Sequence, residues 1–259
     1  MPSAVQVSPS TSPALRLAVI EFETPPNDVF NNHGSYGDIA IKLLRRTLAS
    51  SAELSPLLKV TKVSALEEDS FWPAVDEIDA VLVTGSKYTV ADNDFWVPSL
   101  IGFIRQAYVA KKPLAGICYG HQMIARALGG RTSRNPGGWE LSVHEINFTP
   151  KGAGIFGAES LDMYQMHRDA VIVPPPDVQV IASSAGCQVQ VMYQPGRILG
   201  FQGHPEFDSA ITESWLNERL DEGILEESLY EEAMTRIGRK HDGVLIAAVM
   251  CKFFLGLET

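Results

Sequence analysis

Two short segments of the sequence carry the three side chains of a nucleophilic triad. The first, residues 116–122 (GICYGHQ), places Cys118 between two glycines, where an apolar run gives way to a helical pattern. The second, residues 203–206 (GHPE), offers His204 as a base and Glu206 as a carboxylate that could orient it. A thiol that is activated by an oriented imidazole performs acyl transfer through a covalent intermediate. The sequence therefore predicts a cysteine-dependent acyl-transfer site.

We expect Cys118 to lie at a nucleophile elbow, a sharp turn between a strand over 113–117 and a helix over 120–128. Such an elbow exposes its nucleophile above the carboxyl end of a sheet and needs small neighbours, here Gly116 and Gly120. The N-terminus of the following helix favours the thiolate. The alternative is a buried structural cysteine, because free cysteine is among the most buried residue types. The glycines, the helix and the downstream histidine together favour the nucleophile.

His204 precedes a proline, which favours an extended path of the chain. Residues i and i+2 of an extended segment point to the same side, so Glu206 can reach the imidazole and fix its tautomer. The alternative is a histidine in an ordinary turn at the end of a strand, which the presence of Cys118 makes the weaker interpretation. Outside residues 165–169, a structural role is the better interpretation for the remaining histidines, which are His33, His121, His144 and His241.

Acyl transfer also needs hydrogen-bond donors for the oxyanion that develops on the attacked carbonyl. The backbone N–H of Tyr119, directly after the nucleophile, is one candidate. A second could come from Gly85 and Ser86, which follow the predicted strand over 78–84. Glycine at the end of a strand lets the backbone approach a ligand closely. An ordinary strand-end turn is an equally good interpretation of this glycine.

Alternating strand and helix patterns predict an α/β fold with a doubly wound, mostly parallel sheet. The elements predicted in the first half are strands over 15–23, 57–63, 78–84 and 113–117 and helices over 36–50, 95–110 and 120–128. Short strands joined by Gly/Pro turns should extend this sheet with antiparallel strands; they cover 141–148, 178–183, 188–193 and 198–202. Residues 209–257 are predicted to be helical, with the acidic stretch over 213–232 as a solvated face.

Length, charge and composition exclude several classes of protein. The 259 residues suit one domain over 15–259, preceded by a Ser/Pro-rich segment over 1–14 that we expect to be a disordered tail. The net charge of −10 argues against nucleic-acid binding. No segment has the composition of a signal peptide or a membrane span, and the three cysteines lack disulfide or metal spacing. We therefore expect a cytoplasmic protein that needs no metal or other cofactor.

The two motifs resemble those of the class I glutamine amidotransferase superfamily, which read G-x-C-x-G-x-Q and G-H-P-E. The resemblance extends over residues 15–208. It implies that Cys118 is the nucleophile, His204 the base and Glu206 the third member of the triad. It also implies that Ser86 and Tyr119 provide the oxyanion donors.

The same resemblance implies a set of substrate contacts. Gln122, the last residue of the first motif, would help to hold the glutamyl end of the substrate, and Gly85 is also assigned to substrate binding. Residues 165–169 (QMHRD) are similar to the family's S-H-G-D stretch, whose backbone binds the α-carboxylate. Met166 and His167 are therefore assigned to substrate binding, although Met166 and Arg168 depart from the family pattern.

Within this superfamily the chain looks like the free-standing γ-glutamyl peptidases, which hydrolyse glutathione conjugates and similar peptides. The features that carry this likeness are Gly-Ser-x-Tyr over 85–88, Trp96 and Gly-Trp-Glu over 138–140. Neither a synthase-like segment nor a phosphate-binding loop is recognisable. The resemblance implies a cysteine hydrolase that cleaves γ-glutamyl amide bonds of small-molecule or peptide substrates through a γ-glutamyl thioester.

Two alternatives stay open at the level of sequence. The chain could be a glutaminase subunit that supplies ammonia to a separate synthase partner. It could also be a non-catalytic regulatory protein that keeps the same fold, although the presence of all three triad residues argues against this.

Overall fold

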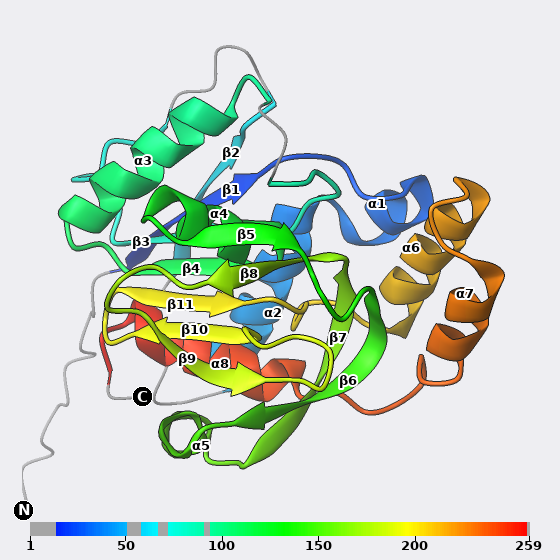
Figure 1. Ribbon diagram of the computed structural model, residues 1–259. Coiled ribbons are helices and arrows are strands. Elements are labelled where there is room, and N and C mark those ends of the chain that lie inside the picture. Colours follow the sequence, from blue (N-terminus) through cyan, green and yellow to red (C-terminus); the bar gives the residue numbers. More distant parts are fainter. Residues whose placement is uncertain (1–13, 51–57, 67–71, 91–93, 258–259) are drawn as a thin grey trace, which may run out of the picture.

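The centre of the molecule is a nine-stranded sheet in the order β2-β1-β3-β4-β11-β10-β9-β6-β7 (Figure 1). The computed structural model describes residues 14–50, 58–66, 72–90 and 94–257. The first five strands run parallel; they are β2 (Leu58–Ser64), β1 (Leu15–Glu21), β3 (Ala80–Val83), β4 (Leu114–Ile117) and β11 (Ile198–Phe201). β3, β4 and β11 are buried at every position, as expected for parallel strands that are covered on both faces.

The remaining strands of this sheet form an antiparallel extension. They are β10 (Val191–Gln194), β9 (Gln179–Ser183), β6 (Glu140–Phe148) and β7 (Ser160–His167). The predicted fold class, an α/β fold whose parallel strands are extended by antiparallel ones, is thereby confirmed.

One detail of the predicted sheet was wrong, and one part of the structure was not predicted. β11 pairs in parallel with β4, so the chain returns to the centre of the sheet after the antiparallel excursion. In addition, β5 (Arg131–Arg134) and β8 (Asp169–Val173) form a separate two-stranded antiparallel sheet. β5 is short, polar and largely exposed, so it lacks the apolar alternation by which a strand is recognised in a sequence.

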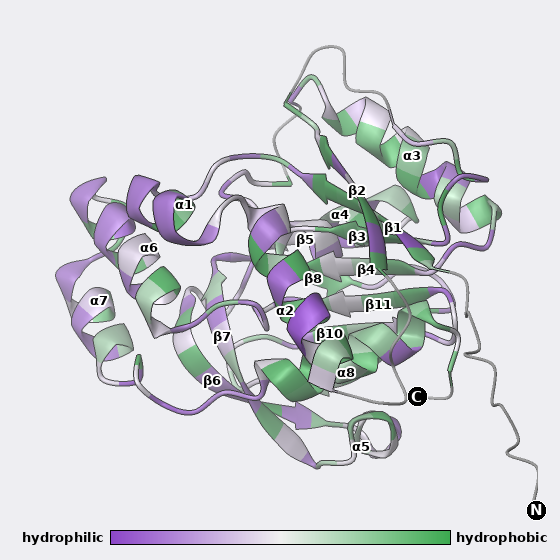
Figure 2. Cartoon of the chain, turned by 180° about the vertical axis from the view of Figure 1, so that it is seen from behind, coloured by the Kyte–Doolittle hydropathy of each residue, from purple (hydrophilic) through white to green (hydrophobic). Residues whose placement is uncertain are grey.

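Helices cover both faces of the large sheet. α2 (Tyr36–Ser50) and α8 (Gly243–Phe254) pack side by side on one face, where the strongly apolar α8 is visible in Figure 2. α3 (Val97–Val109) and α4 (Tyr119–Ala127) pack on the opposite face. The other helices are α1 (Asn27–His33), α5 (Pro150–Phe156), α6 (Ser209–Asp221) and α7 (Glu227–Met234). In Figures 1 and 2, α1, α6 and α7 group beyond one end of the parallel strands and present mostly polar surfaces.

Most of the predicted helices and parallel strands are present within a few residues of the expected bounds. α1, α5, β5, β7 and β8 were not predicted, and the two helices among them are short, with 7 residues each. Of the predicted N-terminal tail, residues 1–13 lie outside the described part of the chain, as does Leu57 of the second predicted strand. Within the described residues, no helix combines the length and apolar character that crossing a bilayer requires.

The topology brings three loops to one edge of the sheet. β3, β4 and β11 are adjacent and parallel, with Val83 and Gly200 both in register with Gly116. Their carboxyl ends therefore lie together, and each is followed by residues that the sequence analysis selected. Gly85 follows β3, Cys118 follows β4, and His204 follows β11. Open α/β sheets bind ligands at this edge.

The close contact between the elbow and β3 generates a prediction about stability. A Cβ atom on Gly120 would lie 2.1 Å from the carbonyl oxygen of Val83, so Gly120→Ala should push α4 away from the sheet. We expect the melting temperature to fall by several degrees, because overpacking costs roughly 1–3 kcal/mol. The matched control is Gly102→Ala in α3, where a Cβ atom meets nothing within 4 Å. That variant should melt at an equal or higher temperature, and equal melting of both variants would contradict the analysis.

Candidate active site

Cys118 occupies a strained turn between β4 and α4. Its backbone adopts φ 49° and ψ −104°, in the left-handed region that non-glycine residues rarely enter. The turn is tied to both neighbouring strands, because Cys118 N–H donates to Phe201 O at 2.7 Å and Gly120 N–H donates to Thr84 O at 3.0 Å. A Cβ atom on Gly116 would lie 2.6 Å from His121 N, so this turn requires glycine there. The geometry is that of the predicted nucleophile elbow.

His204 and Glu206 form a buried pair beside the elbow. His204 Nδ1–H donates to Glu206 Oε1 at 2.8 Å, and both side chains are almost fully buried. The backbone of His204 is fixed by a hydrogen bond to Tyr164 O of β7, and its ring stacks on Phe207 with centroids 4.0 Å apart. Because Glu206 takes Nδ1, the other ring nitrogen, Nε2, is left available for the thiol.

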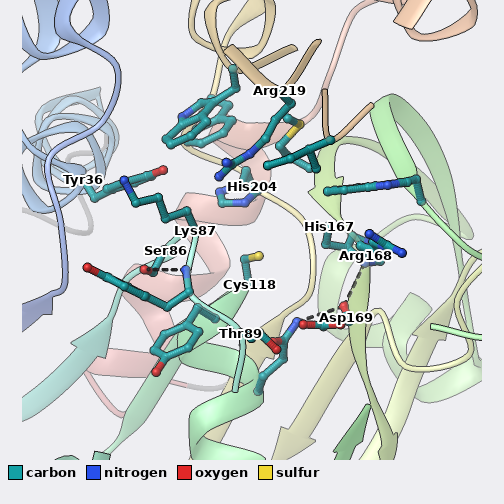
Figure 3. A pocket seen from close by; sticks show the side chains of 18 of the residues that line it. Tyr36, Ser86, Lys87, Thr89, Cys118, His167, Arg168, Asp169, His204 and Arg219 are labelled. Carbon is teal, nitrogen blue, oxygen red and sulfur yellow. Dashed lines mark hydrogen bonds between the residues drawn. The ribbon is translucent and has the colours of Figure 1, made fainter. Parts of the chain in front are cut away.

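In Figure 3 the imidazole of His204 lies next to the thiol of Cys118. Burial lowers the pKa of His204. The charges of Glu206 and Cys118 and the hydrogen bonds to both outweigh this effect and raise the pKa to about 10. The described surroundings therefore favour the imidazolium form of His204. A Cβ atom on Gly85 would lie 2.7 Å from His204 Cε1 and 3.7 Å from Cys118 Cβ, which places the backbone of Gly85 against both residues.

The loop after β3 is held by a carboxylate that the sequence analysis missed. Ser86 Oγ–H donates to Glu23 Oε1 at 3.0 Å, and the backbone N–H of Lys87 donates to the same oxygen. The Lys87 ammonium lies 3.2 Å from Glu23 Oε2. Burial raises the pKa of Glu23, and its hydrogen bonds and Lys87 only partly oppose this shift. The Ser86 hydroxyl is therefore engaged with Glu23, and any oxyanion donor from this loop would be a backbone N–H.

A cavity of about 400 Å³ opens above the thiol. Among the residues selected from the sequence, its walls include Ser86, Cys118, Tyr119, Gln122, Met166, His167 and His204. Glu206 does not line this cavity and lies behind the imidazole. The elbow, the base and the predicted substrate-binding segment therefore border one common space.

Gln122 links the elbow helix to the opposite wall of the cavity. Its Nε2 donates to Asp169 O at 2.9 Å and to Gln202 Oε1 at 3.1 Å. The Gln202 amide in turn donates to Cys118 Sγ at 3.8 Å. Gln122 thus holds the segment around Asp169 in place as well as lining the cavity. Gln202 was missed because it reads as an ordinary residue at the end of a strand.

His167 was predicted to contact substrate, but its imidazole is engaged within the wall. Nδ1 lies 3.0 Å from Asp169 O, and Nε2 lies 3.0 Å from Glu140 Oε2. Glu140 also accepts hydrogen bonds from Ser184 and Gln190. Burial raises the pKa of Glu140, but hydrogen bonding and the charge of His167 outweigh it and hold that pKa low. The imidazole of His167 is therefore held within the wall, while the half-buried Met166 also lines the cavity.

The same network contains the residues that could most readily hold a metal ion. Ligand atoms of Glu140, His167 and Cys187 lie within 4.8 Å of one another. Glu140 and His167 are already paired, and burial raises the pKa of the Cys187 thiol to about 12. Because Glu140 and His167 are already hydrogen-bonded to each other and Cys187 stays a protonated thiol, we assign the cluster no metal.

His121 is unsuited to the role of the base. It is fully buried behind the elbow, where its Nδ1 would lie 2.6 Å from a Cβ atom on Gly200 of β11. Burial lowers the pKa of His121 to about 3, so the ring stays neutral. This agrees with the packing role expected from the sequence.

Comparisons with known proteins agree with this geometry. The chain is 35% identical over 237 residues to a Saccharomyces cerevisiae protein provisionally named a glutamine amidotransferase, covering 86% of this chain and 90% of that protein. It is 29% identical to γ-glutamyl peptidase 2 of Arabidopsis thaliana, covering 70% of this chain and 75% of that protein. The fold matches the crystal structure of a glutamine amidotransferase from Methylobacillus flagellatus with a TM-score of 0.68 at 20% identity, over 95% of this chain and 93% of that one.

The model of the glutamine amidotransferase class-I family matches residues 36–220, a range that contains the elbow, the histidine–glutamate pair and most of the walls of the cavity. With that match over most of its length, the chain belongs to the class I glutamine amidotransferase family.

Proposed function

We propose that this protein is a cysteine hydrolase that cleaves γ-glutamyl amide bonds, with glutathione conjugates or other γ-glutamyl peptides as substrates. The observation that carries the proposal is the strained elbow of Cys118 against the buried His204–Glu206 pair. Cys118 and His204 line a cavity of about 400 Å³, which adds to the argument, because a substrate larger than glutamine needs that space. Relatives named γ-glutamyl peptidases favour this substrate class.

The proposed reaction begins with attack of the Cys118 thiolate on the γ-carbonyl carbon. A carbon–sulfur bond forms, and the carbonyl oxygen becomes an oxyanion that accepts hydrogen bonds from the backbone N–H groups of Tyr119 and of the Gly85–Ser86 loop. As the carbon–nitrogen bond breaks, His204 donates its Nε2 proton to the leaving nitrogen. The amine departs, and a γ-glutamyl thioester remains.

Hydrolysis completes the cycle. Neutral His204 removes a proton from water, and the resulting hydroxide attacks the thioester carbonyl. The carbon–sulfur bond breaks, which releases glutamate and restores the thiolate beside the imidazolium. Glu206 accepts the hydrogen bond from Nδ1 of His204 and so holds the proton there, which leaves Nε2 to perform both proton transfers.

The glutamyl end of the substrate is assigned to the wall formed by Gln122 and residues 166–169. Gln122 fixes Asp169 O, and the Glu140–His167 pair fixes the same segment from behind. A wall whose groups are already hydrogen-bonded is preorganised, so binding substrate need not order it.

A second function has support from the relatives named as glutamine amidotransferases. In that case the protein would release ammonia from glutamine for a separate synthase. A hydrolysis panel separates the two: purified protein is incubated with glutamine, glutathione, an S-substituted glutathione and γ-glutamyl dipeptides, and the released amine and ammonia are measured. Preferential release of peptide or amino acid supports the hydrolase. Turnover of glutamine alone would support the glutaminase instead.

Replacing the nucleophile should abolish turnover while leaving the fold intact. Cys118→Ala is expected to lower kcat by roughly 10³-fold or more on the preferred γ-glutamyl substrate, because no thioester can form. Intact-mass spectrometry of quenched wild-type reactions should show a γ-glutamyl adduct that Cys118→Ala lacks. Cys251→Ala, which removes a thiol buried near α2, is the control and should retain activity. Equal turnover by Cys118→Ala and wild type would refute the proposed mechanism.

Removing the charge of Glu206 should change the pH dependence. The folded-state pKa of His204 is raised to about 10, above its ordinary value, so the proton needed by the leaving group is held through neutral pH and lost as the pH approaches that value. Glu206→Gln removes one cause of the shift, so the alkaline limb of kcat/KM should move to lower pH. We also expect kcat to fall by roughly 10²–10⁴-fold.

The control for this experiment is Glu159→Gln, which removes an exposed carboxylate from the turn before β7, at the opposite end of that strand from His167. Its pH profile should match that of the wild type. An alkaline limb that stays in place in Glu206→Gln would show that this carboxylate does not hold the proton on His204.

A further inference from the structure

We propose that Arg219 binds a carboxylate on the leaving-group side of the substrate, so that this protein prefers γ-glutamyl peptides whose departing amine carries a free carboxylate. This inference rests on the proposed hydrolase function and names its substrate class more closely.

The position of His204 sets the direction in which the leaving group extends. Since His204 protonates the departing nitrogen, that nitrogen must lie beside the imidazole. The glutamyl end is assigned to the wall that contains Arg168 and Asp169. In Figure 3, Arg219 lies beyond His204 as seen from Cys118, whereas Arg168 and Asp169 lie on a different wall of the cavity. The part of the substrate beyond the scissile bond therefore extends toward Arg219.

An aromatic surface follows the imidazole in this direction. Phe207 stacks on His204, and Tyr36 stacks on both Phe207 and Trp215 with centroids 6.3 and 6.1 Å apart. All three aromatic side chains are buried and line the cavity. Burial raises the pKa of Tyr36 well above its ordinary value, so its hydroxyl stays neutral and can donate a hydrogen bond. This surface suits the apolar body of an amino acid residue.

Arg219 lies at the end of the aromatic surface. Its guanidinium carbon is 4.9 Å from the centre of the Trp215 ring, and its side chain is only 12% exposed. Among the described residues its one ion pair joins Nη1 to Glu222 Oε2 at 2.6 Å, and Glu222 is 42% exposed. A guanidinium has five N–H donors, so this pairing leaves donors for a ligand. Arginine on an aromatic face is well suited to bidentate carboxylate recognition.

The other cations around the cavity fit this role less well. Lys87 is paired with the buried Glu23 at 3.2 Å, and Arg134 is paired with Asp169 at 2.7 Å. Arg168 is exposed and lies over Trp139, with its guanidinium carbon 5.9 Å from the ring centre. Arg219 alone in this set combines near burial with a partner that faces solvent. A substrate carboxylate can therefore pair with it under strong shielding from water.

The test compares two substrates that differ in one charge. γ-Glutamyl-leucine carries a free carboxylate on its leaving group, and γ-glutamyl-leucinamide does not. Wild-type protein should hydrolyse the first with the higher kcat/KM, and Arg219→Gln should reduce the ratio of the two values by roughly tenfold to hundredfold. Arg219→Lys keeps the positive charge but loses the planar guanidinium that can donate two parallel hydrogen bonds. It should reduce the ratio of the two kcat/KM values less, and it provides a second variant if Arg219→Gln folds poorly.

Two further variants control for charge and direction. Arg239→Gln removes an exposed positive charge outside the cavity and should leave both rates unchanged. Arg168→Gln removes the exposed cation of the other wall and should leave the ratio unchanged. A ratio of one in the wild type, an unchanged ratio in Arg219→Gln, or a loss of the ratio in Arg168→Gln would each overturn the proposal.

Failure of the proposed γ-glutamyl hydrolase function would give a different experimental result. γ-Glutamyl-p-nitroanilide, whose leaving group has no carboxylate, reports the γ-glutamyl hydrolase activity itself. If wild type turns over neither this anilide nor the two leucine substrates, the proposed function is refuted, and the assignment of Arg219 falls with it. If the anilide is hydrolysed while the two leucine compounds are hydrolysed equally, only the assignment of Arg219 is refuted.

Discussion

The left-handed backbone of Cys118 is the constraint on which the rest of the site depends. A non-glycine residue in this conformation is strained, so surrounding contacts must hold it. N–H groups of the elbow donate to Phe201 O of β11 and to Thr84 O directly after β3, which provides that support from both sides of β4. The nucleophile therefore requires β3 and β11 as immediate neighbours. The same requirement brings Gly85 and His204, which follow those strands, to the thiol.

Sequence reasoning predicted those parts of the site whose signal is local. The glycines around Cys118 and the His-Pro-Glu run each occupy fewer than ten residues, and each has a short-range steric or geometric reason that can be read directly. The parallel placement of β11 beside β4 was missed, because pairing between strands so distant in sequence depends on tertiary contacts. The chemistry of Cys118 and His204 could thus be proposed before the topology that joins them was known.

The supporting roles of two carboxylates were missed by sequence reasoning. Glu23 is an isolated residue, Glu140 was noted only within Gly-Trp-Glu without a role, and a charged residue in a sequence is normally taken as exposed. The structure buries both and surrounds them with donors, Glu23 behind the loop after β3 and Glu140 behind His167. Glu140 also explains why the imidazole of His167 is unavailable to substrate. Burying an unpaired carboxylate is unfavourable, and this favours the conformation in which His167 turns toward it.

The acidic stretch over 213–232 shows why helix faces must be considered separately. Its many glutamates favour a solvated surface, and α6 and α7 do present polar residues outward (Figure 2). The inner face of α6, however, carries Trp215 and Arg219 to the cavity. In a protein with a net charge of −10, an anionic substrate meets a repulsive average field. A nearly buried guanidinium acts at short range, where the walls of the cavity exclude water and screening is weak, so one such group can outweigh the distant surface charges.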